Sequence, residues 1–311
     1  MQDAPSAGRT SRRIALINQK GGVGKTTTTV SLAAAIAQMG RRVLLVDLDP
    51  QAHASLHLGI DPGALETPSV YDLLMDHEAD ANAAALEVRP NLRVIPAETD
   101  LAAAETELVG EANRHGRLAA SLDRLDDLPE FVLLDCPPSL GLLTLNALVA
   151  AREVVIPMQA HFLALQGVSK LLETVRLVRG GLNPRLRVSG VVLCMHDQQA
   201  THTQEVVADM EAFFEQARKD DDSPWKFARV FKPAIRRNIK LAECPSFGQS
   251  IFDYAPFAPG ALDYKKLAEK LVAEWDRAQP RLAAAAVEGK VGTPTDATRQ
   301  QPAPDTAQAT V

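Results

Sequence analysis

Cysteine is scarce in this chain, and the few cysteines present do not form a disulfide or zinc pattern. Cys136, Cys194 and Cys244 lie far apart among 311 residues, and no two of them make a CxxC pair. A disulfide scaffold needs several paired cysteines, and a structural zinc site usually takes four Cys or His ligands. We therefore expect neither kind of site, and a reducing, cytoplasmic setting fits best.

Long apolar runs and an excess of positive charge are also missing. No stretch approaches the roughly 18 apolar residues that a membrane span needs, and residues 1–11 lack the apolar core of a signal peptide. The chain has 33 Lys and Arg against 39 Asp and Glu, a net charge of -6. This balance argues against a protein whose whole surface binds a polyanion, although a local basic patch is compatible with it.

Short apolar segments alternate with segments of helical periodicity. The expected strands are residues 14–17, 43–46, 92–95, 131–134, 154–156 and 188–193. The expected helices are residues 26–39, 118–125, 142–151, 167–178, 203–218 and 262–275. Uninterrupted Val, Ile and Leu runs are typical of strands buried on both faces. The alternation predicts an α/β fold with a doubly wound, mostly parallel sheet and helices on both faces.

Composition divides the chain into a central domain and two polar ends. We expect a disordered N-terminal arm at residues 1–12, one α/β domain at residues 13–279 and a disordered tail at residues 280–311. The tail is rich in Ala, Pro and Thr and poor in large apolar residues. Such a segment buries too little surface to offset the entropy lost on ordering.

A glycine-rich segment follows the first expected strand and leads directly into a helix. It reads Lys20, Gly21, Gly22, Val23, Gly24, Lys25, Thr26 and Thr27. Glycines let backbone N–H groups turn toward phosphate oxygens, and a helix N-terminus favours negative charge. A lysine at the end of such a loop reaches the terminal phosphates, and the following hydroxyl ligates Mg²⁺. We therefore predict a nucleotide site of the P-loop NTPase type, with Lys25 on the phosphates and Thr26 on the metal.

Carboxylates end two of the expected strands, at the edge where parallel sheets bind ligands. Asp135 follows a hydrophobic run and is the expected second residue of the Mg²⁺ site. Asp47 and Asp49 flank Leu48 after another strand. Because residues two apart in a strand point the same way, the pattern alone does not rank these two.

A basic segment contrasts with the acidic whole. Residues 226–242 contain no Asp or Glu and six basic residues: Lys226, Arg229, Lys232, Arg236, Arg237 and Lys240. Rows of Lys and Arg contact DNA phosphates without reading sequence. A solvated basic face without a partner is the alternative. Since no helix-turn-helix pattern is evident, any duplex binding should be non-specific.

These motifs together resemble a known family. The run KGGVGKT, with its early lysine at Lys20, is similar to the deviant Walker A loop of the ParA and MinD superfamily. Residues 44–51 (LLVDLDPQ), 133–139 (LLDCPPS) and 235–248 (IRRNIKLAECPSFG) resemble ParA/Soj partitioning ATPases. The resemblance extends through most of the chain and implies that residues 13–279 form a ParA-like ATPase domain.

The resemblance also implies cofactors, partners and roles. ATP and Mg²⁺ are the implied cofactors, and Lys20, Lys25 and Asp49 the implied catalytic residues. Lys20 would reach the partner's nucleotide across a homodimer, and Asp49 would activate the attacking water. The implied ATP dimer binds double-stranded DNA non-specifically on the nucleoid and is released by hydrolysis that a ParB-like centromere-binding protein stimulates. The implied DNA contacts are Arg236, Arg237 and Lys240, and the neighbourhood of residues 233–238 is the expected base pocket.

Other functions fit part of the pattern. A related ATPase that positions a protein cargo would keep the same nucleotide chemistry. A metabolic P-loop ligase or kinase would hand the γ-phosphate to a small substrate on the same fold. A binding module without turnover conflicts with the intact Lys25, Thr26, Asp49 and Asp135. We expect no membrane cycle, because residues 280–311 do not form a basic amphipathic helix pattern.

Overall fold

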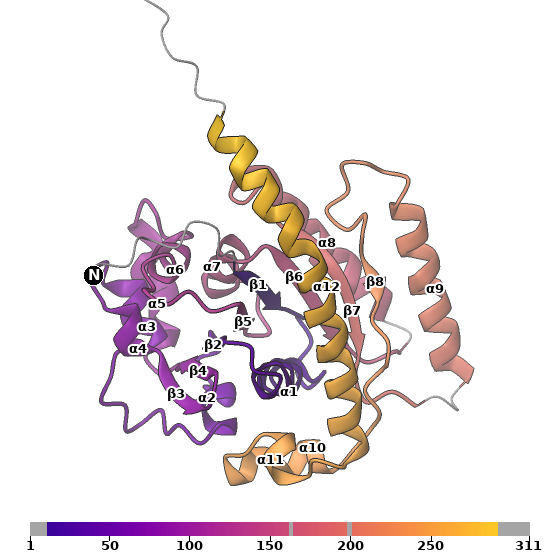
Figure 1. Cartoon of the computed structure of the whole chain (residues 1–311), viewed down its shortest axis with the longest axis horizontal. Coiled ribbons are helices and arrows are strands. Elements are labelled where there is room, and N and C mark those ends of the chain that lie inside the picture. The colour runs from indigo at the N-terminus through magenta and orange to yellow at the C-terminus, as the bar shows by residue number, and fades with distance from the viewer. Residues whose placement is uncertain (1–10, 162–163, 198–200, 292–311) are drawn as a thin grey trace, which may run out of the picture.

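An eight-stranded sheet with helices on both faces forms the centre of the molecule (Figure 1). The structure is a computed structural model, and it describes residues 11–161, 164–197 and 201–291. The strand order is β3-β4-β2-β5-β1-β6-β7-β8. Neighbouring strands run parallel except β3 and β4, which are antiparallel. The predicted fold class is confirmed.

The strands and helices follow the predicted alternation. The strands are β1 (Arg12–Leu16), β2 (Val43–Asp47), β3 (Leu86–Arg89), β4 (Leu92–Ile95), β5 (Phe131–Asp135), β6 (Glu153–Met158), β7 (Arg187–Leu193) and β8 (Arg229–Val230). The longer helices are α1 (Lys25–Gln38), α7 (Leu142–Ala150), α8 (Ala164–Gly181), α9 (Thr201–Ala217) and α12 (Pro259–Val291). The shorter helices are α2 (His53–His57), α3 (Val70–Met75), α4 (Ala81–Ala84), α5 (Leu101–Glu107), η1 (Leu108–Gly110), α6 (Arg117–Leu122), α10 (Lys240–Glu243), η2 (Cys244–Phe247) and α11 (Ile251–Tyr254).

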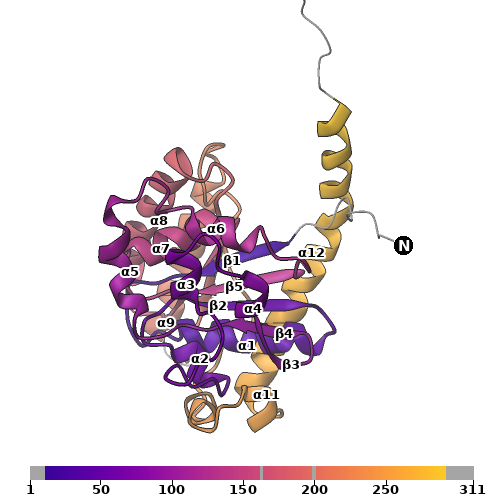
Figure 2. The same cartoon turned by 90° about the vertical axis from the view of Figure 1, so that its left-hand side faces the viewer.

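Each face of the sheet has its own hydrophobic core. On β1, Ile14 and Leu16 pack in the core that includes α1 and α12, whereas Ala15 and Ile17 pack in the core that includes α7 and α8. Figure 2 shows these helices on either side of the strands. Because both faces are covered, the central strands are apolar at nearly every position, which is the pattern that the sequence displays.

The last helix, α12, packs along α1 and extends further than predicted. Its expected apolar stripe, from Leu267 to Trp275, is buried. The helix continues through Pro280 to Val291, so the predicted boundary at residue 280 falls inside it. Alanines at 283–286 favour helix strongly, which outweighs the one hydrogen bond that proline cannot donate. Residues 292–311 of the predicted tail lie outside the described residues.

The N-terminal boundary also needs a small correction. β1 begins at Arg12 and Ser11 is already buried, so the ordered domain starts before residue 13. The remainder of the predicted arm, residues 1–10, lies outside the described part of the chain. Among the helices that the structure describes, none combines the length and apolar character of a bilayer-spanning segment.

Candidate nucleotide-binding site

The loop between β1 and α1 has a backbone shape that requires glycine. Gly22 (φ 70°) and Gly24 (φ 93°) adopt the left-handed conformation, which is strained for residues with a Cβ. A Cβ on Gly24 would also lie 3.4 Å from the side chain of Cys194. Helix α1 begins directly afterwards at Lys25. The loop therefore ends at a helix N-terminus, where backbone amides and the helix dipole favour a phosphate anion.

Side chains from β1 and β6 hold this loop in place. The Asn18 amide donates to the Pro157 carbonyl (2.8 Å), and its carbonyl oxygen accepts from the Lys20 backbone N–H (3.0 Å). The Gln159 amide donates to the Gly22 carbonyl (3.1 Å). The phosphate loop is thus fixed from two neighbouring strands before any ligand binds.

Asp135 lies at the end of β5 and is held by two hydroxyl groups of α1. Thr26 Oγ1 donates to one carboxylate oxygen and Thr29 Oγ1 to the other, each at 2.7 Å. The predicted pairing of Thr26 with Asp135 is therefore present in the geometry. Thr29 was not predicted, although its i,i+3 spacing from Thr26 places both hydroxyls on one face of the helix.

The site concentrates negative charge in a buried place. Asp135 and Asp47 are register partners on β5 and β2, and both are fully buried. Burial, together with the neighbouring Asp47 charge, raises the pKa of Asp135 to about 7. Burial likewise raises the pKa of Asp47 to about 6, although the hydrogen bonds that Asp47 accepts from Ser55 act to lower it. Lys25 is 7% exposed and favours the charged form of Asp135.

The donor set at this place suits Mg²⁺ bound together with phosphates. Within the described residues, no cluster of three or more His, Cys, Asp or Glu side chains could hold a metal by itself. Magnesium usually takes one or two protein oxygens and completes its shell with water and substrate phosphates. Thr26 and Asp135 offer such oxygens beside the phosphate loop, so these residues fit the ion.

Asp47 and Asp49, which the sequence pattern did not distinguish, have different hydrogen-bond partners in the structure. Asp47 accepts hydrogen bonds from Ser55 N (2.9 Å), Ser55 Oγ (2.8 Å) and Asp49 N (3.2 Å). It therefore anchors the turn that leads into α2. Asp49 accepts only from Gln51 N (3.0 Å) among the described residues and is 7% exposed. Asp49 is the freer of the two to meet a ligand or a water molecule.

Lys20 lies on the exposed side of the loop. Its Nζ is 2.6 Å from Nε2 of His161, which follows β6. Gly21 and Gly22 beside it are exposed as well. In a single chain, the lysine predicted to act across a dimer is thus at the surface, and its partner is a histidine ring rather than a carboxylate.

A pocket of about 330 Å³ opens beside the start of α1. Its lining includes Gly24, Thr27, Ile235, Asn238, Ile239 and Tyr264. Tyr264 is held by a hydrogen bond between its hydroxyl and Thr28 Oγ1 (2.9 Å). The segment predicted to hold the base, residues 233–238, contributes Ile235 and Asn238 to this wall.

In the folded structure, nearby carboxylates neutralise most of the positive charge of the basic segment. Carboxylates pair with five of its six residues: Lys226 with Asp221, Arg229 with Glu274, Lys232 with Glu211, Arg236 with Asp263 and Lys240 with Glu243. Arg237 has no hydrogen bond or ion pair to any described residue. The row of charge seen along the sequence is therefore not a continuous basic surface.

Arg236 faces the protein rather than solvent alone. Its guanidinium bonds both oxygens of Asp263 (2.8 and 2.9 Å), a side chain that is 7% exposed. These bonds raise the pKa of Arg236 above its usual value. Arg236 thus has a structural contact beside the pocket, and its side chain is 46% exposed, as is that of Lys240. Among the three predicted DNA residues, Arg237 alone has no ion pair to a described residue.

Comparison with known proteins agrees with this site. A family model described as an AAA domain matches residues 11–188. The sporulation initiation inhibitor protein Soj of Bacillus subtilis is 44% identical over 260 residues, which cover 84% of this chain and 98% of Soj. The chromosome partitioning protein ParA of Caulobacter vibrioides is 42% identical and covers 86% of this chain and 96% of its own length. The chain belongs to the ParA/Soj family of partitioning ATPases.

A solved structure extends this ParA/Soj comparison. It is described as cobyrinic acid a,c-diamide synthase from Mycobacterium smegmatis with bound ATP analog and magnesium. It is 36% identical with a TM-score of 0.72, and the match covers 86% of this chain and 96% of that one. The family predicted from the Lys20 loop and the Asp135 motif is confirmed. The motifs did not reveal Thr29, His161 or Gln159.

Proposed function

We propose that this ParA/Soj-family chain is a Mg²⁺-dependent ATPase that segregates DNA. ATP drives formation of a sandwich dimer, the dimer binds duplex DNA non-specifically, and hydrolysis releases it. The single observation that supports this best is the phosphate loop with Lys20 and Lys25 next to the hydrogen bond from Thr26 to the buried Asp135. The relatives' names as chromosome partitioning proteins support the same function.

Residues 20–27 bind the nucleotide in this proposal. Loop amides and Lys25 bind the phosphates, and the pocket lined by Ile235 and Asn238 takes the base. Thr26 and Asp135 hold Mg²⁺, which neutralises phosphate charge when it is bound. Thr29 fixes the Asp135 carboxylate, and Asp49 orients the attacking water.

Lys20 makes the nucleotide-dependent contact between two protomers. Its amine is exposed and bonded only to His161 among the described residues, so it can move to a partner's nucleotide at small cost. A nucleotide can shift an equilibrium only through contacts that differ between states. A contact from Lys20 to a γ-phosphate is such a difference, because ADP lacks that group.

Arg237 and Lys240 contact DNA phosphates. Lys240 must leave its pair with Glu243, which is exposed to solvent on both sides and therefore weak. Two contacts from each protomer give four in a dimer. Four phosphate contacts give a slope of about −3.6 for log affinity against log salt, a loss of about 10²-fold between about 50 and about 200 mM.

A salt titration of DNA affinity tests this proposal. Affinity for a labelled random duplex is measured with Mg²⁺ and a non-hydrolysable ATP analogue. Arg237→Gln with Lys240→Gln should lower the affinity and flatten the slope toward zero. Lys226→Gln is the matched control, since Lys226 is in the same segment but paired with Asp221. An unchanged slope in the double variant would reject the DNA surface.

The identity of the partner and of the cargo distinguishes two candidate functions, DNA segregation and the positioning of a protein cargo. We propose a ParB-like centromere-binding protein as the stimulating partner and the nucleoid in the cytoplasm as the location. A protein cargo is the second candidate, and the partner whose addition accelerates phosphate release identifies which of the two operates. ATP turnover that depends on a small acid instead of DNA would support the metabolic alternative that the M. smegmatis enzyme's name suggests.

A further inference from the structure

Arginines gather at the amino-terminal edge of the sheet, the opposite end from the phosphate loop. The Arg152 N–H donates to the Arg13 carbonyl (3.0 Å), and the Arg187 N–H donates to the Arg152 carbonyl (3.1 Å). These three residues therefore start three adjacent strands, β1, β6 and β7, at a spacing of about 4.8 Å. Arg185 precedes Arg187 by two residues. We call Arg13, Arg152, Arg185 and Arg187 the arginine edge.

The charge of the arginine edge is only partly compensated. Arg13 pairs with Asp123 (2.6 Å), but the Arg152 and Arg185 side chains have no hydrogen bond or ion pair to any described residue. Partial burial and the nearby arginines lower the pKa of Arg152. Two arginine side chains, Arg152 and Arg185, therefore remain without a neutralising carboxylate.

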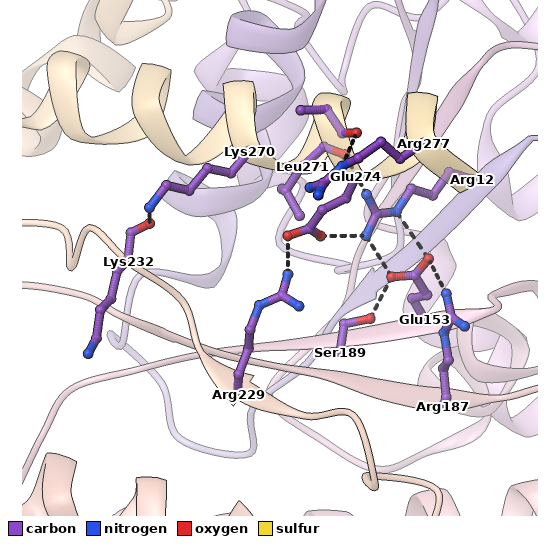
Figure 3. A network of polar contacts seen from close by, with 11 residues as sticks. Arg12, Glu153, Arg187, Ser189, Arg229, Lys232, Lys270, Leu271, Glu274 and Arg277 are labelled. Atoms are coloured by element: carbon purple, nitrogen blue, oxygen red, sulfur yellow. Dashed lines mark hydrogen bonds and ion pairs between the residues drawn. The ribbon is translucent and has the colours of Figure 1, made fainter. Parts of the chain in front are cut away.

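The contact between Arg187 and Glu153 does little to neutralise the arginine edge. It contacts Glu153 (3.1 Å), a carboxylate already bonded by Arg12 through two nitrogens and by Ser189. Figure 3 shows Glu153 between Arg12 and Arg187. Since Arg12 neutralises Glu153, the guanidinium of Arg187 keeps its charge and part of its donor capacity at the surface, where its side chain is 57% exposed.

A cavity of about 250 Å³ adjoins the arginine edge at Arg187. Its lining includes Val188, Phe227 and Trp275. Phe227 is 69% exposed, which is unusual for a large apolar side chain. The Trp275 Nε1–H is buried and donates to no described residue. The cavity thus offers apolar walls beside the ion pairs of Arg12 with Glu153 and of Arg229 with Glu274, which also line it.

We propose that the arginine edge and this cavity bind an acidic segment of a partner protein. Guanidinium groups pair with carboxylates in a bidentate manner, so Asp or Glu side chains bind Arg152, Arg185 and Arg187. An apolar side chain of the same segment enters the cavity against Phe227. Arginine and aromatic residues are enriched in protein–protein interfaces, which this combination matches.

Two features favour an acidic protein segment over duplex DNA. The phosphate backbone has no apolar group that could fill a cavity beside Phe227 and Trp275. The surface also lies at the far end of the sheet from residues 20–27, so it is the same with ADP and with ATP. A DNA contact that does not depend on the nucleotide would oppose release of the protein from DNA after hydrolysis. The proposal is otherwise independent of the proposed function.

Fluorescence anisotropy of the full chain tests the proposal. The probe is a labelled synthetic peptide of Glu and Asp with one central leucine, and a second peptide carries serine in place of that leucine. We expect the leucine peptide to bind more tightly, with equal affinity in ADP and in a non-hydrolysable ATP analogue. Arg152→Gln with Arg185→Gln should weaken binding at least tenfold, and Phe227→Ala should abolish the preference for leucine.

Arg218→Gln, directly after α9, is the matched control, because Arg218 is also an exposed arginine but pairs with Glu215. Unchanged peptide affinity in the double variant, or equal loss in the Arg218 control, would overturn the proposal. Loss of duplex DNA affinity in the double variant, without loss of peptide affinity, would assign the surface to nucleic acid instead. None of these outcomes bears on the nucleotide site, which can be assayed in the same samples by ATP turnover.

Discussion

Replacing Arg12 with methionine removes one half of a buried ion pair that joins three elements of the fold. Arg12 is 5% exposed and Glu153 is 3% exposed. Arg12 donates from Nε (3.0 Å) and Nη2 (2.8 Å) to the two oxygens of Glu153, and from Nη1 to the Leu271 carbonyl of α12 (2.7 Å). Burial acts to raise the pKa of Glu153, but the charges of Arg12 and Arg187 and the hydrogen bonds from Arg12 and Ser189 together outweigh it, and the pKa falls to about 2.

The expected cost of Arg12→Met is about 3 kcal/mol, because the buried Glu153 carboxylate then keeps only the exposed Arg187 and the Ser189 hydroxyl as partners. Adding Glu153→Leu should recover most of this loss, since a buried pair exchanged for apolar residues is often neutral. Arg218→Gln, at an exposed pair at the end of α9, should change stability by less than about 0.5 kcal/mol.

Urea denaturation at neutral pH, followed by the fluorescence of Trp225 and Trp275, measures these free energies of unfolding. Trp275 packs edge to face on Phe131 in the core, so its emission reports the fold. A loss below about 1 kcal/mol for Arg12→Met, or no recovery in the double variant, would refute the reasoning.

Three further predictions concern other positions. Burial lowers the pKa of His57 from 6.5 to about 4. The contribution of this neutral histidine to the free energy of unfolding is therefore complete above the unfolded pKa and is lost as the pH falls from about 6.5 to about 4. Between about pH 7.5 and about pH 5, the free energy of unfolding should drop by about 2 kcal/mol more in the wild type than in His57→Asn. Gly190→Ala places a Cβ 2.0 Å from the Arg229 carbonyl at φ 147°, and calorimetry should show a loss on the order of 3 kcal/mol, which a wild-type melting curve would contradict. Thr29→Val removes one hydrogen bond to buried Asp135, and ATP turnover should fall roughly tenfold, while Thr106→Val, at an exposed threonine of α5, stays close to wild type.

The sequence predicted the central sheet well because its strands are covered on both faces. Continuous apolar runs marked six strands, and each is present. Strands β3 and β8 were missed, because they are four and two residues long and lie at the sheet edges, where no apolar run is needed. The end of α12 was missed because Pro280 usually stops a helix and the following alanines outweigh it.

The candidate site was predictable where its residues are contiguous or end a strand. The loop at 20–27 and Asp135 are of this kind. The contact of Lys20 with His161 and that of Gly22 with Gln159 join segments more than 130 residues apart, so no local pattern shows them. Three of the carboxylates that neutralise the basic segment, Glu211, Asp263 and Glu274, come from helices α9 and α12, and a charge count along residues 226–242 does not show them.

The mass of the purified protein in solution tests the central claim most directly. Light scattering after size exclusion compares ADP with a non-hydrolysable ATP analogue, each with Mg²⁺. The account predicts a monomer with ADP, twice that mass with the analogue, and a monomer under both conditions for Lys20→Ala, with nucleotide binding retained. A wild-type monomer that binds the analogue, or a Lys20→Ala protein that dimerises as well as the wild type, would contradict it.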